Sequence, residues 1–473
     1  MTNVLLATSN GTGMGHLTRQ AAVGLALADT NRGVLFSLSI GLPLATSLGL
    51  DGEYVPSYDR PWIESKAWNG YLRDRLVAII EEAVIDVVLF DGVAVYPGIG
   101  ETSSMLRDVA FVWLRRGMWR PGANPKQLRR ANYFDRVIEP GDLAADADVG
   151  PTADQPDVTR VGPISLIETL HLLPRDEARA ALGLPPEPEI ALVTLGSGRL
   201  GDVTGPGQVA IRALLEESDM HVAVTRSAVA ENEVLVERED RVTVIRDRFP
   251  LLPYLGAFDV GVSSAGYNAV HELVPSGLAT LFVANTSTRT DDQQARSTRL
   301  AQLGLGLHAA DDDPTGVETG IRLLLDRSRR HDIAAAAVAT RPGMTGASET
   351  GRIVTDFADS FTRRRPKVSV AVSEQVQRAK DAVKAALGEE RTNTLKRLLG
   401  RHPSPIAHRT EVRLVEAVVP APGNGPLPLL VTETLEGATL RGPNPVEHLL
   451  PGSSPSYRAR RLDLIHHYYD VAP

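Results

Sequence analysis

The sequence predicts an α/β protein made of two doubly wound parallel-sheet domains in tandem, followed by a basic C-terminal extension. Short apolar runs alternate with helical patterns up to about residue 360, which is typical of βαβ units. This pattern breaks once, at residues 142–157, where the chain is polar and rich in small residues, and then restarts. The length of 473 residues also exceeds the roughly 250–300 residues that one hydrophobic core supports.

The first domain is expected to span residues 1–150. The apolar runs predict strands at residues 4–8, 33–39, 53–56, 87–90, 111–114 and 136–138. Helical patterns lie between them, notably at residues 65–83 and 101–107. The polar run at residues 142–157 is interpreted as a domain boundary or linker.

The second domain is expected to span residues 158–345. Its predicted strands are residues 190–195, 221–225, 242–245, 260–263, 279–283 and 305–308, with a helix at about residues 207–217. A closing helix is expected at residues 346–362. Each domain then has an ordinary size.

The C-terminal extension, residues 363–473, differs in charge from the body. It holds 17 basic and 11 acidic residues, a balance of +6, whereas the preceding residues carry −14. Residues 376–387 have apolar side chains at helical spacing. Two interpretations stay open: an interfacial helix drawn to anionic lipid, or docking on the acidic body. The acidic body argues against nucleic acid as a partner.

The sequence argues against several kinds of functional site and against secretion or insertion into a membrane. The chain has no cysteine, which excludes disulfides, thiolate metal sites and cysteine nucleophiles. The acidic pairs lack the spacing of a metal site. The N-terminus lacks the basic region of a signal peptide, and no apolar stretch reaches the roughly 20 residues of a membrane span. A cytoplasmic protein is expected, with peripheral contact at the inner face of the membrane as an option for the basic tail.

The turn after the first predicted strand, "SNGTGMGHLTR", is the first candidate site. Glycines there permit positive φ and close backbone approach, and the N–H groups at a helix start suit an anion. A histidine at that position could act as a general base. The alternative is a tight packing turn without chemistry. The candidate residues are Gly11, Thr12, Gly13, Gly15, His16 and Arg19.

The second domain supplies a second set of candidate ligand-binding residues. A glycine-rich turn ends its first predicted strand, and a second turn opens the helix that carries Glu272. A carboxylate and paired glutamines suit recognition of ribose and sugar hydroxyls. Alternatively, Glu272 is a solvated surface acid and the glutamines are ordinary helix-entry residues. The set comprises Gly196, Ser197, Gly198, Phe249, Ser264, Gly266, Glu272, Asp292, Gln293 and Gln294. The stretch "WLRRGMWR", residues 113–120, either faces basic groups toward the site or forms an edge.

Together these motifs resemble the two-domain GT-B glycosyltransferases over about residues 1–361, and most closely the family of peptidoglycan (lipid II-forming) N-acetylglucosaminyl transferases. The resemblance implies two Rossmann-like domains that face each other across a cleft. It further implies that His16 faces the acceptor, that the turn at residues 196–198 holds the donor diphosphate and that Glu272 binds the uridine ribose. Residues 291–294 would touch the donor sugar.

The activity that the resemblance implies is metal-independent transfer of a sugar, with inversion, from a UDP-sugar. The sugar would be N-acetylglucosamine or similar, and the acceptor a small or lipid-linked molecule. No cofactor is expected besides the UDP-sugar co-substrate. His16 would take the acceptor proton, and helix N-termini would stabilise the departing diphosphate.

Three positions depart from the family pattern and leave two alternatives. The first turn is one residue longer, Ser264 replaces an arginine, and Ser297 replaces an asparagine. Residues 13–19, "GMGHLTR", also resemble the G-x-G-H-x-x-R motif of GT-B-shaped nucleotide-sugar hydrolases, in which water replaces the acceptor. A nucleotide-sugar-binding protein without activity is the third interpretation.

Overall fold

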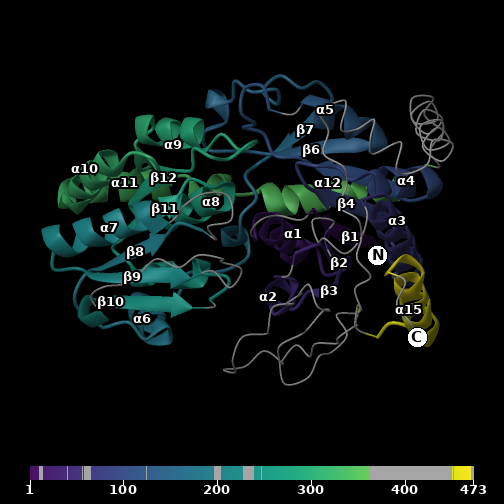
Figure 1. Ribbon diagram of the computed structural model, residues 1–473, viewed down its shortest axis with the longest axis horizontal. Helices are drawn as coiled ribbons and strands as arrows, with labels where there is room; N and C mark the ends of the chain where they lie inside the picture. Colours follow the sequence, from purple (N-terminus) through teal and green to yellow (C-terminus); the bar gives the residue numbers. More distant parts are fainter. Residues whose placement is uncertain are drawn as a thin grey trace, which may run out of the picture.

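A computed structural model describes most of the body of the chain and the helix near its C-terminus. The described residues are 1–9, 14–39, 41–55, 57, 65–123, 125–196, 204–226, 239–246, 248–362, 450 and 452–469. Figure 1 shows two lobes side by side, each a sheet with helices packed on its faces. Among these residues no helix combines the length and the apolar content that crossing a bilayer requires.

The described strands of the first domain form one parallel sheet in the order β3-β2-β1-β4-β5-β6-β7. Its central strands are buried on both faces, as the unbroken apolar runs of a parallel sheet require. The strands are β1 (Asn3–Thr8), β2 (Arg32–Ser37), β3 (Asp51–Tyr54), β4 (Val87–Asp91), β5 (Ala110–Leu114), β6 (Arg136–Pro140) and β7 (Val158–Val161). The connecting helices are α1 (Gly15–Ala26), α2 (Leu42–Thr46), α3 (Ser65–Glu82), α4 (Pro97–Met105) and α5 (Pro125–Leu128).

The first domain extends further than its predicted limit of residue 150. Strand β7 pairs in parallel with β6, in the register Val137 to Val158. The polar run at residues 142–157 therefore joins two neighbouring strands of one sheet and does not separate the domains. A four-residue strand at a sheet edge, half-exposed along most of its length, carries too weak an apolar pattern to be recognised from sequence.

The described strands of the second domain form a parallel sheet in the order β10-β9-β8-β11-β12-β13. This is the doubly wound order in which the first strand lies next to the fourth. The strands are β8 (Ile190–Thr194), β9 (His221–Arg226), β10 (Val242–Arg246), β11 (Val260–Ser264), β12 (Thr280–Ala284) and β13 (Leu307–Ala310). The helices are α6 (Arg175–Leu182), α7 (Thr204–Glu217), α8 (Tyr267–Ser276), α9 (Gln293–Gln302), α10 (Pro314–Leu325) and α11 (Arg327–Val338).

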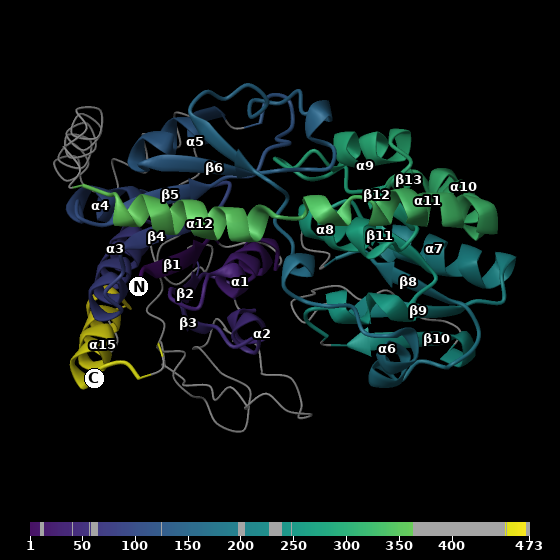
Figure 2. The same ribbon diagram turned by 180° about the vertical axis from the view of Figure 1, so that it is seen from behind.

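Helix α12 (Gly346–Asp359) returns from the second domain to the first, as Figure 2 shows. It packs against α1, and its buried Ala347 and Val354 belong to an apolar cluster that runs through both domains. The Glu168 carboxylate accepts hydrogen bonds from the backbone N–H groups of Ala347 and Ser348, at 2.8 and 2.9 Å. A carboxylate at a helix N-terminus also complements the helix dipole.

The C-terminal helix α15 (Pro455–Tyr469) packs along α3 of the first domain, and both views show the two side by side. The Tyr457 hydroxyl donates to Glu53 Oε2 at 2.8 Å. Glu53 is fully buried and also pairs with Arg75. At the surface, Arg460 pairs with Glu81 at 2.5 Å. The end of the extension thus docks on an acidic part of the body, whereas the amphipathic residues 376–387 lie outside the described residues.

Candidate active site

The candidate catalytic histidine lies at the carboxyl edge of the first sheet. Helix α1 begins at Gly15, directly before His16, and β4 ends at Asp91 beside it. His16 Nδ1 lies 2.7 Å from Asp91 Oδ1. The His16 side chain is 13% exposed and that of Asp91 is 2% exposed. A buried carboxylate thus holds the imidazole ring in one orientation.

Arg19 binds the same carboxylate from the next turn of α1. Its Nε donates to Asp91 Oδ2 at 2.9 Å and its Nη2 to Oδ1 at 2.8 Å, a bidentate pair. Burial opposes ionisation of Asp91, but Arg19 and His16 outweigh burial and hold the pKa of this carboxyl below its ordinary value. Asp91 is therefore an ionised acceptor at neutral pH.

His16 Nδ1 lies 2.7 Å from Asp91 Oδ1, which accepts a hydrogen bond, and 2.8 Å from Arg19 Nη2, which donates one. In the tautomer with the proton on Nδ1, the ring donates to ionised Asp91. Nε2 then presents a lone pair, and it makes no hydrogen bond to the described residues. Burial lowers the pKa of His16 below its ordinary value, against the opposing effect of Asp91. A neutral imidazole with a free Nε2 can accept a proton from a hydroxyl or from water.

Helix α8 of the second domain begins next to this group. Asn268 Nδ2 donates to the Gly15 carbonyl at 3.0 Å, and Asn268 Oδ1 accepts from Arg19 at 3.4 Å. The Arg19 guanidinium lies over the Tyr267 ring, 5.2 Å from its centroid. The first turn of α8 is thus hydrogen-bonded to the turn that carries His16.

Several predicted donor-binding residues meet where strands of the second sheet end. Gly196, after β8, has a φ of +91°, which favours glycine. A Cβ at Gly196 would lie 3.9 Å from Ser264 Oγ. A Cβ at Gly266 would lie 3.9 Å from the same oxygen and 4.0 Å from Gln293 Nε2. Gly266 itself precedes α8, whose first N–H groups face this region without a capping side chain.

Glu272 lies on α8 in a setting that suits a hydroxyl-bearing ligand. Its side chain is partly buried, and it has no hydrogen-bond or ion-pair partner in the described part of the chain. Burial raises the pKa of Glu272 to about 7. A carboxyl in such surroundings gains from any partner that donates hydrogen bonds to it.

The side chains of Asp292, Gln293 and Gln294, at the start of α9, form most of their hydrogen bonds within the protein. Asp292 Oδ1 caps α9 by accepting from Ala295 N at 3.0 Å, and Gln293 Oε1 accepts from Asn285 N at 3.1 Å. Gln294 Nε2 lies 3.2 Å from His308 Nε2, whereas its Oε1 is buried without a partner. Gln293 Nε2 and Gln294 Oε1 therefore keep hydrogen-bonding capacity for a ligand.

Asp291 joins the two domains through arginines. Its Oδ1 accepts from Arg116 of the first domain at 2.7 Å and lies 2.9 Å from Arg296 Nη1. Although burial acts in the opposite direction, Arg116 and Arg296 lower the pKa of Asp291 to about 2. Arg296 also binds Asp142, at 2.8 Å, and the Ala265 carbonyl, at 3.0 Å.

The remaining predicted site residues are placed as follows. Gly11, Thr12, Gly13, Ser197 and Gly198 lie outside the described residues. Phe249 is half-buried between β10 and the 3-10 turn Leu252–Ala257. Among the described residues no group of three or more acidic or histidine side chains is arranged to hold a metal ion.

Sequence reasoning missed the partners that organise this site. Asp91 directly follows a predicted strand and precedes Gly92, a position where it could have been noticed. Its pairing with His16 spans 75 residues, and no local pattern carries that information. The same holds for Asn268 and Asp142, which meet their partners only after the domains pack.

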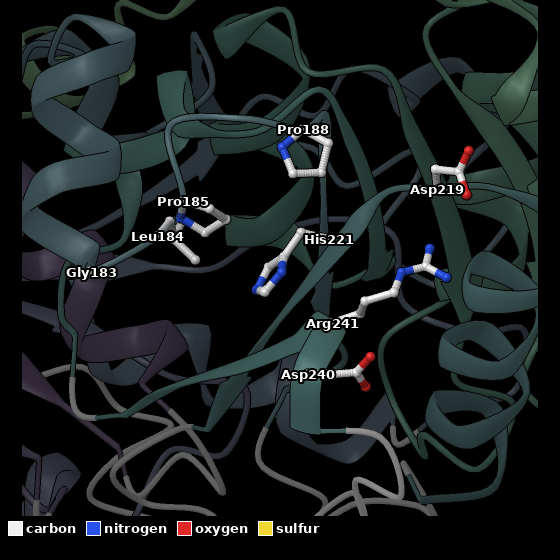
Figure 3. Close-up of a pocket in the computed structure, with 8 residues that line it drawn as sticks. All are labelled: Gly183, Leu184, Pro185, Pro188, Asp219, His221, Asp240 and Arg241. Atoms are coloured by element: carbon white, nitrogen blue, oxygen red, sulfur yellow. The ribbon is translucent and has the colours of Figure 1, made fainter.

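A cavity of about 630 Å³ lies elsewhere, at the amino edge of the second sheet (Figure 3). Its polar side chains serve the fold. His221 Nε2 lies 2.8 Å from Thr243 Oγ1, and Arg241 donates to the carbonyls of Leu215, Ser218 and Met220. In doubly wound sheets ligands bind at the carboxyl ends of strands, so this cavity is not the candidate site.

Comparison with known proteins supports the fold. No protein family model matches the chain. Over 191 residues it is 30% identical to the UDP-N-acetylglucosamine--N-acetylmuramyl-(pentapeptide) pyrophosphoryl-undecaprenol N-acetylglucosamine transferase of Salinibacter ruber (strain DSM 13855 / M31), a match that covers 39% of this chain and 51% of the relative. The chain thus spans about half the length of the curated relative that it matches.

Solved structures are similar over about three quarters of the chain. Spinosyn forosaminyltransferase SpnP has a TM-score of 0.54 at 16% identity and covers 76% of this chain and 100% of its own. Spinosyn rhamnosyltransferase SpnG, complexed with thymidine diphosphate, has a TM-score of 0.53 at 15% identity and covers 75% and 100%. The glycosyltransferase SnogD from Streptomyces nogalater has a TM-score of 0.50 at 17% identity and covers 76% and 99%. The chain has the GT-B fold, and the predicted fold class is confirmed.

Proposed function

We propose that this chain is a glycosyltransferase that moves a sugar from a UDP-sugar to an acceptor hydroxyl. N-acetylglucosamine is the first sugar to test, because the curated relative transfers it. The observation that carries the proposal is the Asp91–His16 pair, which lies beside the start of α8. The pair supports the proposal because His16, a candidate base, belongs to the first domain and α8, which begins beside it, carries the candidate donor-binding residue Glu272 of the second.

In the proposed reaction the acceptor hydroxyl loses its proton to His16 Nε2. Its oxygen forms a bond to the anomeric carbon while the bond from that carbon to the diphosphate breaks. The electron pair leaves on the diphosphate oxygen. Displacement in one step inverts the anomeric centre. Asp91 would stabilise the imidazolium that forms.

The donor would be held by the second domain. Its diphosphate would lie against the open N–H groups at the start of α8 and beside Gly196, where a helix N-terminus favours negative charge. Glu272 would accept hydrogen bonds from the ribose hydroxyls. Gln293 Nε2 and Gln294 Oε1 would meet the sugar.

Hydrolysis of the nucleotide sugar is the second candidate, favoured by the Arg19–Asp91–His16 arrangement. In this arrangement the Asp91 carboxylate contacts both His16 and Arg19, the histidine and the arginine of the hydrolase-like motif. Water would then replace the acceptor hydroxyl at Nε2. The same base serves both reactions, so only the products distinguish them.

The test is turnover of a panel of UDP-sugars by wild-type protein and by His16→Ala. General-base catalysis contributes about 10²–10⁴-fold, so the variant should lose that much in kcat while UDP affinity stays within about threefold. A hydrolase releases free sugar from the donor alone at its full rate, whereas a transferase releases free sugar only slowly and attaches the sugar to the acceptor when one is added. UDP binding without any turnover would support the binding-protein alternative and contradict both enzymatic proposals.

A further inference from the structure

Arg116 is a cation of the first domain that the reaction proposed above does not use. It follows strand β5, and its side chain is only 14% exposed. One end of its guanidinium is fixed, because Nη1 donates to Asp291 Oδ1 at 2.7 Å. Nearby, Trp119 forms an isolated antiparallel bridge with Asp291. Arg116 therefore lies where the first domain meets the loop that precedes α9.

The other edge of the Arg116 guanidinium makes no hydrogen bond to the described residues. Its Nε is buried without a hydrogen-bond partner, and no hydrogen bond of Nη2 to the described residues is present. In Arg19 the same two nitrogens form a bidentate pair with Asp91. Arg116 thus presents a free, planar pair of donors whose geometry matches a carboxylate or a phosphate.

Charge around Arg116 also favours an anion. Arg116 and Arg296 share one oxygen of Asp291, and Arg296 Nη2 is itself buried without a partner. Burial lowers the pKa of Arg116; Asp291 opposes this effect, and the nearby charges of Arg19 and Arg296 add to it. Buried polar groups in proteins nearly always have a hydrogen-bond partner. The unpaired Nε of Arg116 and Nη2 of Arg296 therefore favour a bound anion at this position.

The position of Arg116 selects the donor diphosphate as that ligand. Its charge acts on His16 and Arg19, and its guanidinium binds the loop before α9. An acceptor oxygen at His16 must reach the anomeric carbon, which carries the sugar-linked phosphate on its other side. Arg116 binds the donor loop, and its charge lowers the pKa of His16, so it is a candidate partner of that phosphate.

We infer that the Nε–Nη2 edge of Arg116 binds the sugar-linked phosphate of the nucleotide-sugar donor. The inference rests on the proposed function and adds to it a contact from the opposite domain. As the bond to the anomeric carbon breaks, the leaving diphosphate gains negative charge, which Arg116 would offset. Helix α8 supplies only backbone N–H groups and a dipole to that charge.

Binding of UDP and UMP to wild-type protein, Arg116→Gln and Asp291→Asn, by calorimetry, tests the inference. Arg116→Gln leaves Asp291 paired with Arg296, whereas Asp291→Asn leaves Arg296 paired with Asp142 and Arg116 without a carboxylate partner. A hydrogen bond to a charged group contributes about 1.5–3 kcal/mol, so Arg116→Gln should weaken UDP binding about 10- to 100-fold. UMP binding should change less than about threefold, because UMP lacks the second phosphate.

Asp291→Asn should give the opposite sign, because it removes a counter-charge of Arg116 and so should strengthen UDP binding. Arg212→Gln on the exposed face of α7 is the control for net charge and should leave UDP binding unchanged. Equal losses of UDP affinity in Arg116→Gln and Asp291→Asn would overturn the inference, since they would indicate a purely interdomain role. So would normal UDP affinity in Arg116→Gln together with a raised KM for the acceptor, which would assign an anion of the acceptor to Arg116.

Failure of the inference and failure of the proposed function are distinguishable. If wild-type protein binds neither UDP nor thymidine diphosphate, the proposed function is wrong. If wild-type protein binds UDP and Arg116→Gln binds it equally well, with no change for the acceptor, only the inference is wrong.

Discussion

Asp91 is the residue on which the proposed role of His16 depends. Its carboxylate can accept a hydrogen bond from Nδ1 of the imidazole, and it raises the pKa of His16 against the effect of burial. Arg19, bound to both oxygens, keeps this carboxylate ionised. The three side chains act as one unit, so a change in Asp91 should appear in the pH dependence of His16.

Asp91→Asn should lower kcat and also shift its pH profile. The rate depends on neutral His16 and therefore rises with pH through the pKa of His16. Without the Asp91 charge that pKa falls further, so the acidic limb should move to lower pH while the plateau falls by about 10²-fold or more. Initial rates between pH 4 and 9 measure both effects.

The control for Asp91→Asn is thermal unfolding, because Arg19 loses its buried partner. Breaking a buried pair costs about 3–5 kcal/mol, so some loss of stability is expected. A lower melting temperature with an unshifted acidic limb would show that Asp91 serves only the fold.

Glu272 should make nucleoside binding pH-dependent. Its pKa of about 7 in the free protein means that it is partly protonated at neutral pH. Ribose hydroxyls that donate to the carboxylate favour the ionised form, so binding lowers the pKa and the affinity should rise as pH rises through 7. The dissociation constant of uridine, measured between pH 6 and 8, tests this. Uridine is used because it has no phosphate group that would itself titrate in this range. Glu272→Gln should show weak, pH-independent binding, and a persisting pH dependence in that variant would exclude Glu272 as its source.

At the residue scale the sequence was informative wherever a local rule applied. Glycines at strand ends, a histidine at a helix start and an acid on the following helix are local features, and they made His16, Gly196 and Glu272 candidates for the site. Asp91 and Arg116 acquire their partners through packing over 75 and 175 residues, which no spacing rule expresses. Asp292 was predicted to bind the ligand, but its side chain caps the N-terminus of α9. An aspartate before a helix has the same sequence pattern in both roles.

At the element scale, α15 is part of the first domain although it lies near the end of the chain. Leu450 and Tyr457 are buried in the apolar cluster on the outer face of the first sheet. The Ser454 backbone N–H and hydroxyl donate to the two oxygens of Glu82, at 2.6 and 2.8 Å. Helix α15 thus covers α3 with both apolar and polar contacts.

Tyr457→Phe should destabilise the protein without affecting nucleotide binding. The change leaves Glu53 Oε2 buried without the Tyr457 hydroxyl, and an unsatisfied buried acceptor costs about 1–3 kcal/mol. Urea unfolding should show this loss, while UDP affinity stays at the wild-type value. A Tyr457→Phe protein of full stability would mean that α15 leaves α3 in solution.

The elements themselves were predicted unequally, for a physical reason. Buried parallel strands are continuous apolar runs, and the central strands of both sheets were predicted within one or two residues. Strand β7 is short and half-exposed, and α15 is a polar helix with an arginine-rich face. Their stability comes from tertiary contacts with β6 and α3, so the local pattern gave no signal of them.

At the scale of the whole molecule, the two domains are held together near the site by more than one connection. Helix α12, the Trp119–Asp291 bridge and the Asp142–Arg296 pair all cross between them. Tyr267 adds a further contact: its hydroxyl donates to the Gly141 carbonyl at 2.8 Å and accepts from the Ile164 N–H at 3.0 Å. It thus binds both segments of the first domain that flank β7.

Tyr267→Phe should therefore loosen the pairing of the two domains and lower kcat more than uridine affinity. Two backbone groups would lose their partner, at about 1–3 kcal/mol each where they are buried, whereas Gly266, Glu272 and Gln293 would stay together within the second domain. Small-angle scattering should show a wider range of domain arrangements, and uridine affinity should change less than about threefold. Tyr254→Phe, a half-buried tyrosine of the second domain whose hydroxyl has no partner among the described residues, is the matched control. Because His16 and Arg116 lie on the first domain and Glu272 on the second, catalysis and diphosphate binding require their relative placement, whereas uridine binding does not. A Tyr267→Phe variant that loses kcat and uridine affinity to the same extent would contradict this division.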